Sequence, residues 1–161
     1  MSLSPAQNVI LKAAILAEPS LANAILTGND AMIAAWLNAP SSPAFIVWRT
    51  EVAAGETGNA WVGTDIDGMS ALNMQRLQLM LASSPSGVFD MARADRRAGF
   101  ENPFGASASN ASRVAMRAAW KRQATRLEKL LSTGTGSDAT PATMGFVGAV
   151  SPQEITNARN S

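Results

Sequence analysis

The sequence contains no cysteine, no histidine and no tyrosine. Without cysteine the chain has no disulfide, no zinc–thiolate site and no thiol nucleophile. Without histidine it lacks the commonest general base and metal ligand. No run approaches the roughly 18 apolar residues of a membrane-spanning helix, and the start Met1-Ser2-Leu3-Ser4-Pro5 lacks the basic segment of a signal peptide. We therefore expect no enzyme, no cofactor, no metal and no membrane contact.

Charge of either sign is scarce overall but unevenly distributed. The 161 residues are 47% hydrophobic and carry a net charge of +1, which suits one globular domain without a global attraction to nucleic acid. Residues 1–92 contain seven acids and three bases, whereas residues 93–129 contain nine bases and three acids. The second stretch predicts a basic surface.

Caps and apolar spacing predict helices along most of the chain. Ser4-Pro5 is an N-cap followed by proline at the first helical position. Val9, Ala13 and Leu16 then recur at helical spacing, which predicts a helix over 5–17. By similar signals we expect further helices over 21–26, from Asn29 to near Pro40, over 71–82 with Leu72 and Leu77 inward, and over 88–99 with Phe89 inward.

Two intermediate stretches are harder to assign. Residues 44–52 contain β-branched and aromatic side chains typical of a strand, but Phe45, Trp48 and Val52 are spaced as in a helix. The cap-plus-proline pair Ser42-Pro43 favours a helix there. Residues 53–68 contain four glycines and are expected to form a loop. We expect the four tryptophans to share one core.

A long basic helix, capped by Ser109 or Asn110 and ending at Leu131, is expected to be the spine of the fold. The stripe Met116, Trp120, Gln123/Ala124, Leu127, Leu131 has helical spacing and should face the core. A dozen small polar residues follow, and then an apolar run over 144–150. This ending predicts an arm, so the expected fold is mainly α: a small helical bundle over 1–131 with an extended C-terminal arm over 132–161 that carries a short β segment.

The basic helix and the arm supply the candidate partner-binding residues. The basic rows of the helix fit a solvated flank, an ionic contact with an acidic protein, or a contact with nucleic acid. Gly134-Thr135-Gly136 follows a helix, so it indicates a helix cap and hinge rather than a dinucleotide site. Asp65 and Asp67 indicate a turn rather than a calcium loop. The candidates are Arg113, Arg117, Lys121, Arg122, Arg126, Thr135, Asp138, Met144, Phe146, Val147 and Val150.

Three stretches resemble one group of small structural proteins of tailed bacteriophages. They are the start Ser2-Leu3-Ser4-Pro5-Ala6-Gln7, the middle from Asn38-Ala39-Pro40 to Arg49-Thr50, and the end from Trp120-Lys121-Arg122 to Thr140-Pro141-Ala142-Thr143-Met144. By size and layout this group resembles head–tail connector (adaptor) proteins. No connector motif is recognised in residues 63–68 or 105–110.

The resemblance implies a non-enzymatic subunit of the phage neck, assembled in the host bacterial cytoplasm. Such subunits form a homo-oligomeric ring, commonly of twelve copies, beneath the portal protein, and often reach the portal with a C-terminal segment. Further neck or tail proteins would be partners, and genomic DNA would pass close by. The alternatives are another virion part, such as a tail-completion or capsid decoration protein, or a nucleic-acid-binding regulator that uses the basic helix over 113–129.

Overall fold

A computed structural model describes residues 3–161, which form ten α-helices, two short 3-10 helices and six strands of two or three residues each. The protein is mainly α, as the sequence predicts. The chain divides into two compact units: unit 1 contains the residues up to Val47 together with Gln123–Ser161, and unit 2 contains Trp48–Arg122. The expected division into 1–131 and 132–161 does not coincide with these units.

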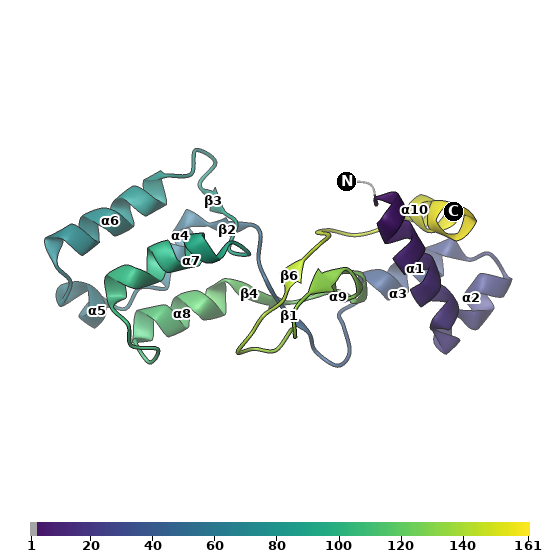
Figure 1. The fold of residues 1–161 in the computed structure, drawn as a ribbon, viewed down its shortest axis with the longest axis horizontal. Helices are drawn as coiled ribbons and strands as arrows, with labels where there is room; N and C mark the ends of the chain where they lie inside the picture. The colour runs from purple at the N-terminus through teal and green to yellow at the C-terminus, as the bar shows by residue number, and fades with distance from the viewer. Residues whose placement is uncertain (1–2) are drawn as a thin grey trace. The chain divides into compact units, whose positions relative to one another are not determined.

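Unit 1 combines helices from both ends of the chain (Figure 1). Its elements are α1 (Pro5–Ala17), η1 (Pro19–Leu21), α2 (Ala22–Leu26), α3 (Asp30–Asn38), β1 (Ile46–Trp48, whose last residue belongs to unit 2), α9 (Arg126–Leu130), β5 (Ser132–Thr133), β6 (Thr143–Met144) and α10 (Pro152–Asn160). The expected helix over 5–17 is confirmed, and it begins with a capping box in which Ser4 and Gln7 each bond the other's backbone amide.

The core of unit 1 is almost entirely aliphatic. Leu11 and Ile15 of α1 pack with Ile33 and Leu37 of α3, and α10 covers both helices. From α10, Ile155 and Ala158 contribute side chains without solvent exposure. Close packing of this kind depends on two chain ends that are more than a hundred residues apart in sequence.

The structure does not confirm an extended C-terminal arm. Of the expected arm, Phe146, Val150 and Ile155 belong to the unit 1 core. The Asn38 side chain bonds both the amide and the carbonyl of Val150, each at 2.9 Å. Burying each large apolar side chain stabilises the folded chain by about 1.5–3 kcal/mol, so an apolar run of this length packs on its own unit when no partner is present. The short β segment is β6, which pairs with β5 in the register Ser132↔Met144.

Glycine is required at two positions near β5 and β6, one between the two strands and one directly after β6. Gly136 has φ +66°, and a Cβ built there would lie 2.2 Å from the Phe45 ring. At Gly145 a Cβ would lie 2.4 Å from the Leu131 carbonyl oxygen. Any side chain would displace these neighbours. The glycines therefore allow close packing rather than forming a nucleotide fingerprint.

Unit 2 is a continuous segment of chain. Its elements are β2 (Val52–Ala53), α4 (Ala54–Asn59), α5 (Gly63–Asp67), α6 (Ala71–Ala82), β3 (Val88–Phe89), α7 (Ala94–Glu101), η2 (Asn102–Phe104), α8 (Ala111–Ala119) and β4 (Lys121–Gln123, whose last residue belongs to unit 1). β2 and β3 pair antiparallel, with Val52 opposite Phe89, and β4 pairs with β1. The helix expected over 71–82 is confirmed with its Ser70 cap.

Aromatic and sulfur-containing side chains fill the core of unit 2. Phe100 contacts Phe89 edge-on at 5.1 Å between ring centroids and Trp120 at 6.1 Å. Met91 and Met116 are fully buried beside them. The Trp120 indole donates a 3.1 Å hydrogen bond to the buried Thr57 hydroxyl. Trp36 belongs to unit 1, so the expectation that all four tryptophans share one core was wrong.

The long basic helix is interrupted. α8 ends at Ala119, β4 follows, and α9 begins only at Arg126. Lys121, Arg122 and Gln123 are good helix formers, but here the backbone bonds another strand: Arg49 donates to the Trp120 carbonyl, and Ala124 donates to the Phe45 carbonyl. Tertiary pairing therefore overrides local propensity. The apolar stripe that the sequence predicts is nevertheless buried, because the two helices and the extended segment between them all turn these side chains toward a core. Its buried residues are Met116, Trp120, Ala124, Leu127 and Leu131.

Three other expectations need correction. Residues 44–52 contain β1 and the first residue of β2 rather than a helix, since their backbone groups bond β4 and neighbouring loops. The expected loop over 53–68 contains α4 and α5, with Trp61 half-buried beside Phe104. In the stretch over 88–99, Val88 and Phe89 form β3, and the helix begins only at Ala94. Phe89 is buried as predicted.

Candidate protein-binding site

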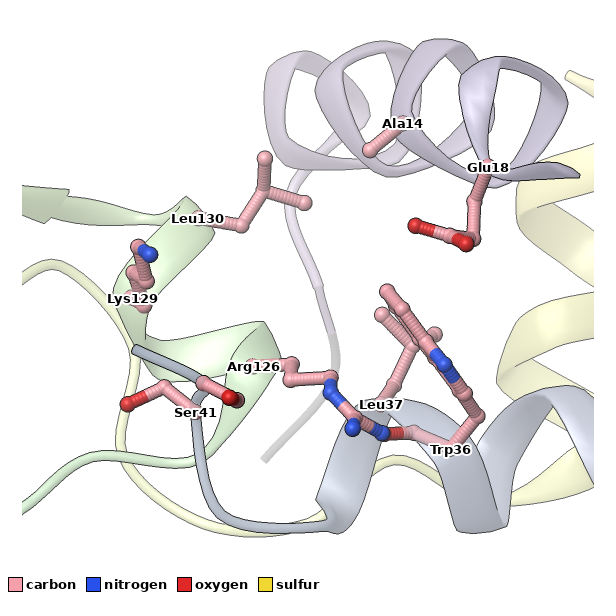
Figure 2. A pocket seen from close by; sticks show the side chains of 9 residues that line it. Ala14, Glu18, Trp36, Leu37, Ser41, Arg126, Lys129 and Leu130 are labelled. Carbon is pink, nitrogen blue, oxygen red and sulfur yellow. The ribbon is translucent and has the colours of Figure 1, made fainter. Parts of the chain in front are cut away.

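A pocket of about 240 Å³ lies in unit 1, between α1, α3 and α9. α1 contributes Ala14, and Glu18 directly follows that helix. α3 contributes Trp36 and Leu37, and α9 contributes Arg126, Lys129 and Leu130. Figure 2 shows the Arg126 side chain extending toward Trp36, with the Glu18 carboxylate facing the same space from the end of α1. The pocket therefore has an apolar floor between two cations and one acid.

The start of α9 sets the positions of both cations. The Thr125 hydroxyl accepts a hydrogen bond from the Glu128 amide, and the Glu128 carboxylate accepts one from the Thr125 amide. This capping box fixes the first turn of the helix. Arg126 and Lys129 are three residues apart and so lie on one side of α9. Glu128 points inward and is only 2% exposed.

Arg126 is held in place by Trp36. Its guanidinium carbon lies 4.5 Å from the centroid of the Trp36 ring, and Nη1 donates a 3.0 Å hydrogen bond to the Trp36 carbonyl. A guanidinium over an indole face is attracted to the ring electrons. These contacts occupy one face of the guanidinium and one of its nitrogens, so its other N–H groups are available to a ligand. Because the side chain is already ordered, binding would lose little conformational entropy.

Lys129 and Glu18 supply the remaining charges of the pocket. The Lys129 ammonium lies 5.8 Å from the Phe45 ring centroid and makes no hydrogen bond or ion pair within residues 3–161. The Ser20 hydroxyl and amide donate to Glu18 at 2.6 and 3.1 Å. These bonds lower the pKa of Glu18 from an ordinary value that is already well below neutral pH, so the carboxylate is charged. The pocket is therefore net positive by one charge.

The size and lining of the pocket limit what it can hold. Small-molecule sites usually enclose roughly 300–1,000 Å³, so this pocket is small for a cofactor. It has room for one or two side chains of a protein partner. The aliphatic floor suits an apolar side chain, and the two cations suit a carboxylate beside it.

A second cluster of charged side chains lies in unit 2. Glu101 accepts hydrogen bonds from Arg117 Nε at 2.6 Å, from Arg117 Nη2 at 2.7 Å and from Arg113 Nη2 at 3.0 Å. Burial alone would raise the pKa of Glu101, but the bonds and charges of Arg117 and Arg113 outweigh it and hold the pKa below its ordinary value of 4.5. This cluster joins α7 to α8.

The structure distributes the predicted site residues over both units. Arg113 and Arg117 engage Glu101, and Lys121 and Arg122 are half-buried in β4, whereas Arg126 lines the pocket of unit 1. The single basic face expected for these residues does not exist, because the helix that would carry it is broken. Four candidates of the expected arm pack within unit 1: Met144, Phe146 and Val150 are buried, and Val147 is half-buried.

Two further candidates, Thr135 and Asp138, lie in the exposed turn between β5 and β6. The Thr135 hydroxyl donates to the Thr140 carbonyl at 3.0 Å within that turn. Sequence reasoning missed Glu18, Trp36 and Lys129 as residues of one pocket. The pattern Thr125-x-x-Glu128 could have placed a new helix start at Arg126, but only the fold brings α1 and α3 beside it.

One face of α1 is apolar but uncovered. Leu11 and Ile15 face the core, whereas Val9 and Leu16 are 63% and 62% exposed, and Ala13 between them is exposed too. The stripe that the sequence singles out on this helix is thus the outer one. A helix that is apolar on both faces is usually buried on both. The outer stripe of α1, defined by Val9, Ala13 and Leu16, is therefore a candidate contact surface.

Comparisons with models of protein families, with curated proteins and with solved structures found no match. Within residues 3–161 no three acidic, histidine or cysteine side chains are grouped as they would be to hold a metal ion. In the same part of the chain no single helix is long and apolar enough to cross a membrane, and one pair, Pro5–Ala17 with Pro19–Leu26, meets the criterion only as a segment bent by 83°.

Proposed function

We propose that this chain is a non-enzymatic structural subunit of a phage virion, a head–tail connector that assembles into a ring below the portal. The observation that carries the proposal is the uncovered apolar stripe of α1, Val9, Ala13 and Leu16. Exposed apolar surface of this kind is characteristic of proteins that are buried against partners. The three stretches that resemble small phage structural proteins supply the identity of the assembly.

Exposed apolar side chains on unit 2 support the same proposal. On α6, Leu72 and Leu79 are 57% and 63% exposed and lie seven residues apart, on one face of the helix. The sequence expectation that Leu72 points inward was wrong. A ring subunit has a neighbour on each side, so it needs two separate contact surfaces. α1 and α6 offer one such surface on each unit.

In this proposal the C-terminal segment is extended only in the assembled particle. In the single chain the side chains of Phe146 and Val150 are buried in unit 1. To reach the portal, residues 132–161 would have to exchange these contacts for equivalent ones on a partner. Arg113 and Arg117 donate to Glu101 rather than lining an open basic face, so we do not favour a nucleic-acid-binding regulator.

Sizing of the purified full chain with light scattering tests the proposal, followed by negative-stain electron microscopy of any large species. We expect closed rings at high protein concentration. The variant Leu16→Ser should weaken assembly, because it places a hydroxyl in the outer stripe of α1. The matched control Leu26→Ser changes a residue that is 85% exposed on α2, outside that stripe. A chain that stays monomeric at its highest soluble concentration would overturn the proposal.

A further inference from the structure

The pocket of unit 1 has a chemical counterpart on the surface of unit 2. Val88 in β3 is 38% exposed, and Asp90, two residues later, is exposed as well. Phe89 between them faces the core. Because successive side chains of an extended segment alternate, Val88 and Asp90 project from the same side, about 7 Å apart. This outer edge presents one aliphatic group beside one carboxylate, and the charges of Arg93 and Arg97 are close enough to interact with that carboxylate.

We propose that the pocket of unit 1 binds the Val88–Asp90 edge of unit 2 from a second copy of this chain. In this arrangement Val88 lies on the floor formed by Ala14, Leu37 and Leu130, and the Asp90 carboxylate lies between Arg126 and Lys129. The inference rests on the proposed function, since it names the contact through which one ring subunit holds the next.

Charge and size favour this occupant. The pocket holds two cations with available donors, and Asp90 supplies one negative charge. The volume of about 240 Å³ accommodates a valine side chain and a carboxylate but not a folded element. Glu18 on the opposite wall disfavours a doubly charged phosphate and the repeated phosphates of a nucleic acid, because each would place like charges close together.

The choice of Val88 among the exposed apolar residues follows from its neighbours. The large apolar side chains exposed within residues 3–161 are Val9, Ile10, Leu16, Leu26, Met32, Leu72, Leu79, Val88 and Val114. Leu16 is two residues from an acid, Glu18, but Glu18 lines the pocket and so is not the acid that the pocket would bind. Val88 has an exposed acid within two residues that lies outside the pocket. The edge is also rigid, since Val88 pairs with Ala53 and the Asp90 carboxylate caps the Ala92 amide at 2.9 Å.

A contact between unit 1 of one copy and unit 2 of the next is heterologous. Each copy uses a different surface on its two sides, so repetition of the contact in one direction generates a ring or a filament, whereas two copies that exchange the contact reciprocally would close a dimer. Every copy except those at an open end has both its pocket and its edge occupied. This property permits a test in which one surface is broken on each of two proteins.

The test uses sedimentation velocity on the full chain and on two single variants. Arg126→Glu places a negative charge in the pocket, and Val88→Ser removes the apolar group of the edge. We expect each variant alone to self-associate about tenfold or more weakly than the wild-type chain. Mixed in equal amounts, the intact edge of the first fits the intact pocket of the second, so one-to-one pairs should be the main species of the mixture.

The controls are Gln153→Glu, which adds a negative charge on α10, and Val114→Ser, which removes an exposed valine side chain from α8. Both residues lie outside the pocket, the Val88–Asp90 edge and the apolar surfaces of α1 and α6. They should retain assembly more fully than the pocket and edge variants. Circular dichroism melts establish that each variant is folded, and Lys129→Glu replaces Arg126→Glu if that variant does not fold. Variants that assemble like the wild-type chain, or a mixture that forms no pairs, would overturn the docking but leave the proposed ring standing. A wild-type chain without self-association would overturn both.

Discussion

Unit 1 and unit 2 are built from differently arranged sequence and stabilised by different side chains. Unit 2 is one continuous segment, Trp48–Arg122, with a core of Phe89, Phe100, Trp120 and two methionines. Unit 1 joins the first part of the chain to the last, and its core is aliphatic. Both are mainly helical, so helix content alone does not distinguish them. The difference lies in how far apart in sequence the packed residues are.

This difference predicts where each unit is vulnerable. Unit 2 depends on a few large rings and on a buried carboxylate that two arginines neutralise. Unit 1 depends on α10, whose side chains complete a core formed mainly by α1 and α3. Contacts between distant residues are formed against a larger loop-closure entropy. The following predictions test whether the two units respond separately.

The largest effect is expected for Trp120→Ala in unit 2. Trp120 has no solvent exposure, and its removal leaves a cavity beside Phe100 and an unpaired Thr57 hydroxyl. We expect the free energy of unfolding of unit 2 to fall by about 3–5 kcal/mol. Amide hydrogen exchange checks this: amides of α7 and α8 should lose protection while those of α1 and α3 keep theirs. Equal loss in both units would mean that they unfold as one.

The next effect is expected for Ile155→Ala in unit 1. Ile155 is fully buried on α10 against the aliphatic core. We expect the free energy of unfolding of unit 1 to fall by about 2–5 kcal/mol, because the cavity opens where the chain ends close the unit. Gln153→Ala on the exposed side of α10 is the control and should change stability little. Exchange that accelerates in unit 2 rather than in α1 and α3 would contradict this assignment.

A smaller, pH-dependent effect is expected for Glu101→Gln in unit 2. Burial opposes the charged form, but the hydrogen bonds from Arg117 and Arg113 hold the pKa of Glu101 below 4.5. A lowered native pKa contributes stability that is present above the unfolded pKa and lost as pH falls through the native one. Replacing the carboxylate should lower the unfolding free energy at neutral pH by about 1.5–3 kcal/mol, the size of hydrogen bonds to charged groups.

Denaturant unfolding between pH 7 and pH 3 measures that dependence. The wild-type unit 2 should lose stability as pH falls below about 4.5, and the unfolding free energy of the variant should change less over the same pH range. Glu51→Gln changes an exposed acid of the same unit and serves as the control. Unit 1 should keep its own acid dependence in the variant, because the pKa of Asp30 is lowered by the Thr156 hydroxyl and by Arg159. If Glu101→Gln left the acid dependence of the unfolding free energy unchanged, the role assigned to this cluster would be wrong.

Much of the fold was determined by local sequence. Ser4-Pro5 and Ser70 marked helix starts that the structure confirms, because a capping side chain satisfies amides within its own first turn. Asn29 and Ser151 act in the same way for α3 and α10. The inward stripe from Met116 to Leu131 was predicted correctly because burial of apolar side chains holds for helix and strand alike.

Other features were decided only by the tertiary structure. The long basic helix breaks at Trp120 because its backbone bonds β1, a partner more than seventy residues earlier in the sequence. Which of the two apolar stripes of α1 faces the core depends on where α3 and α10 pack. Helical spacing in the sequence does not encode that packing. The pocket requires α1, α3 and α9 together, so no local pattern contains it. Capping and apolar burial act between near neighbours in sequence, whereas strand pairing and pocket formation depend on contacts that exist only after the chain has folded.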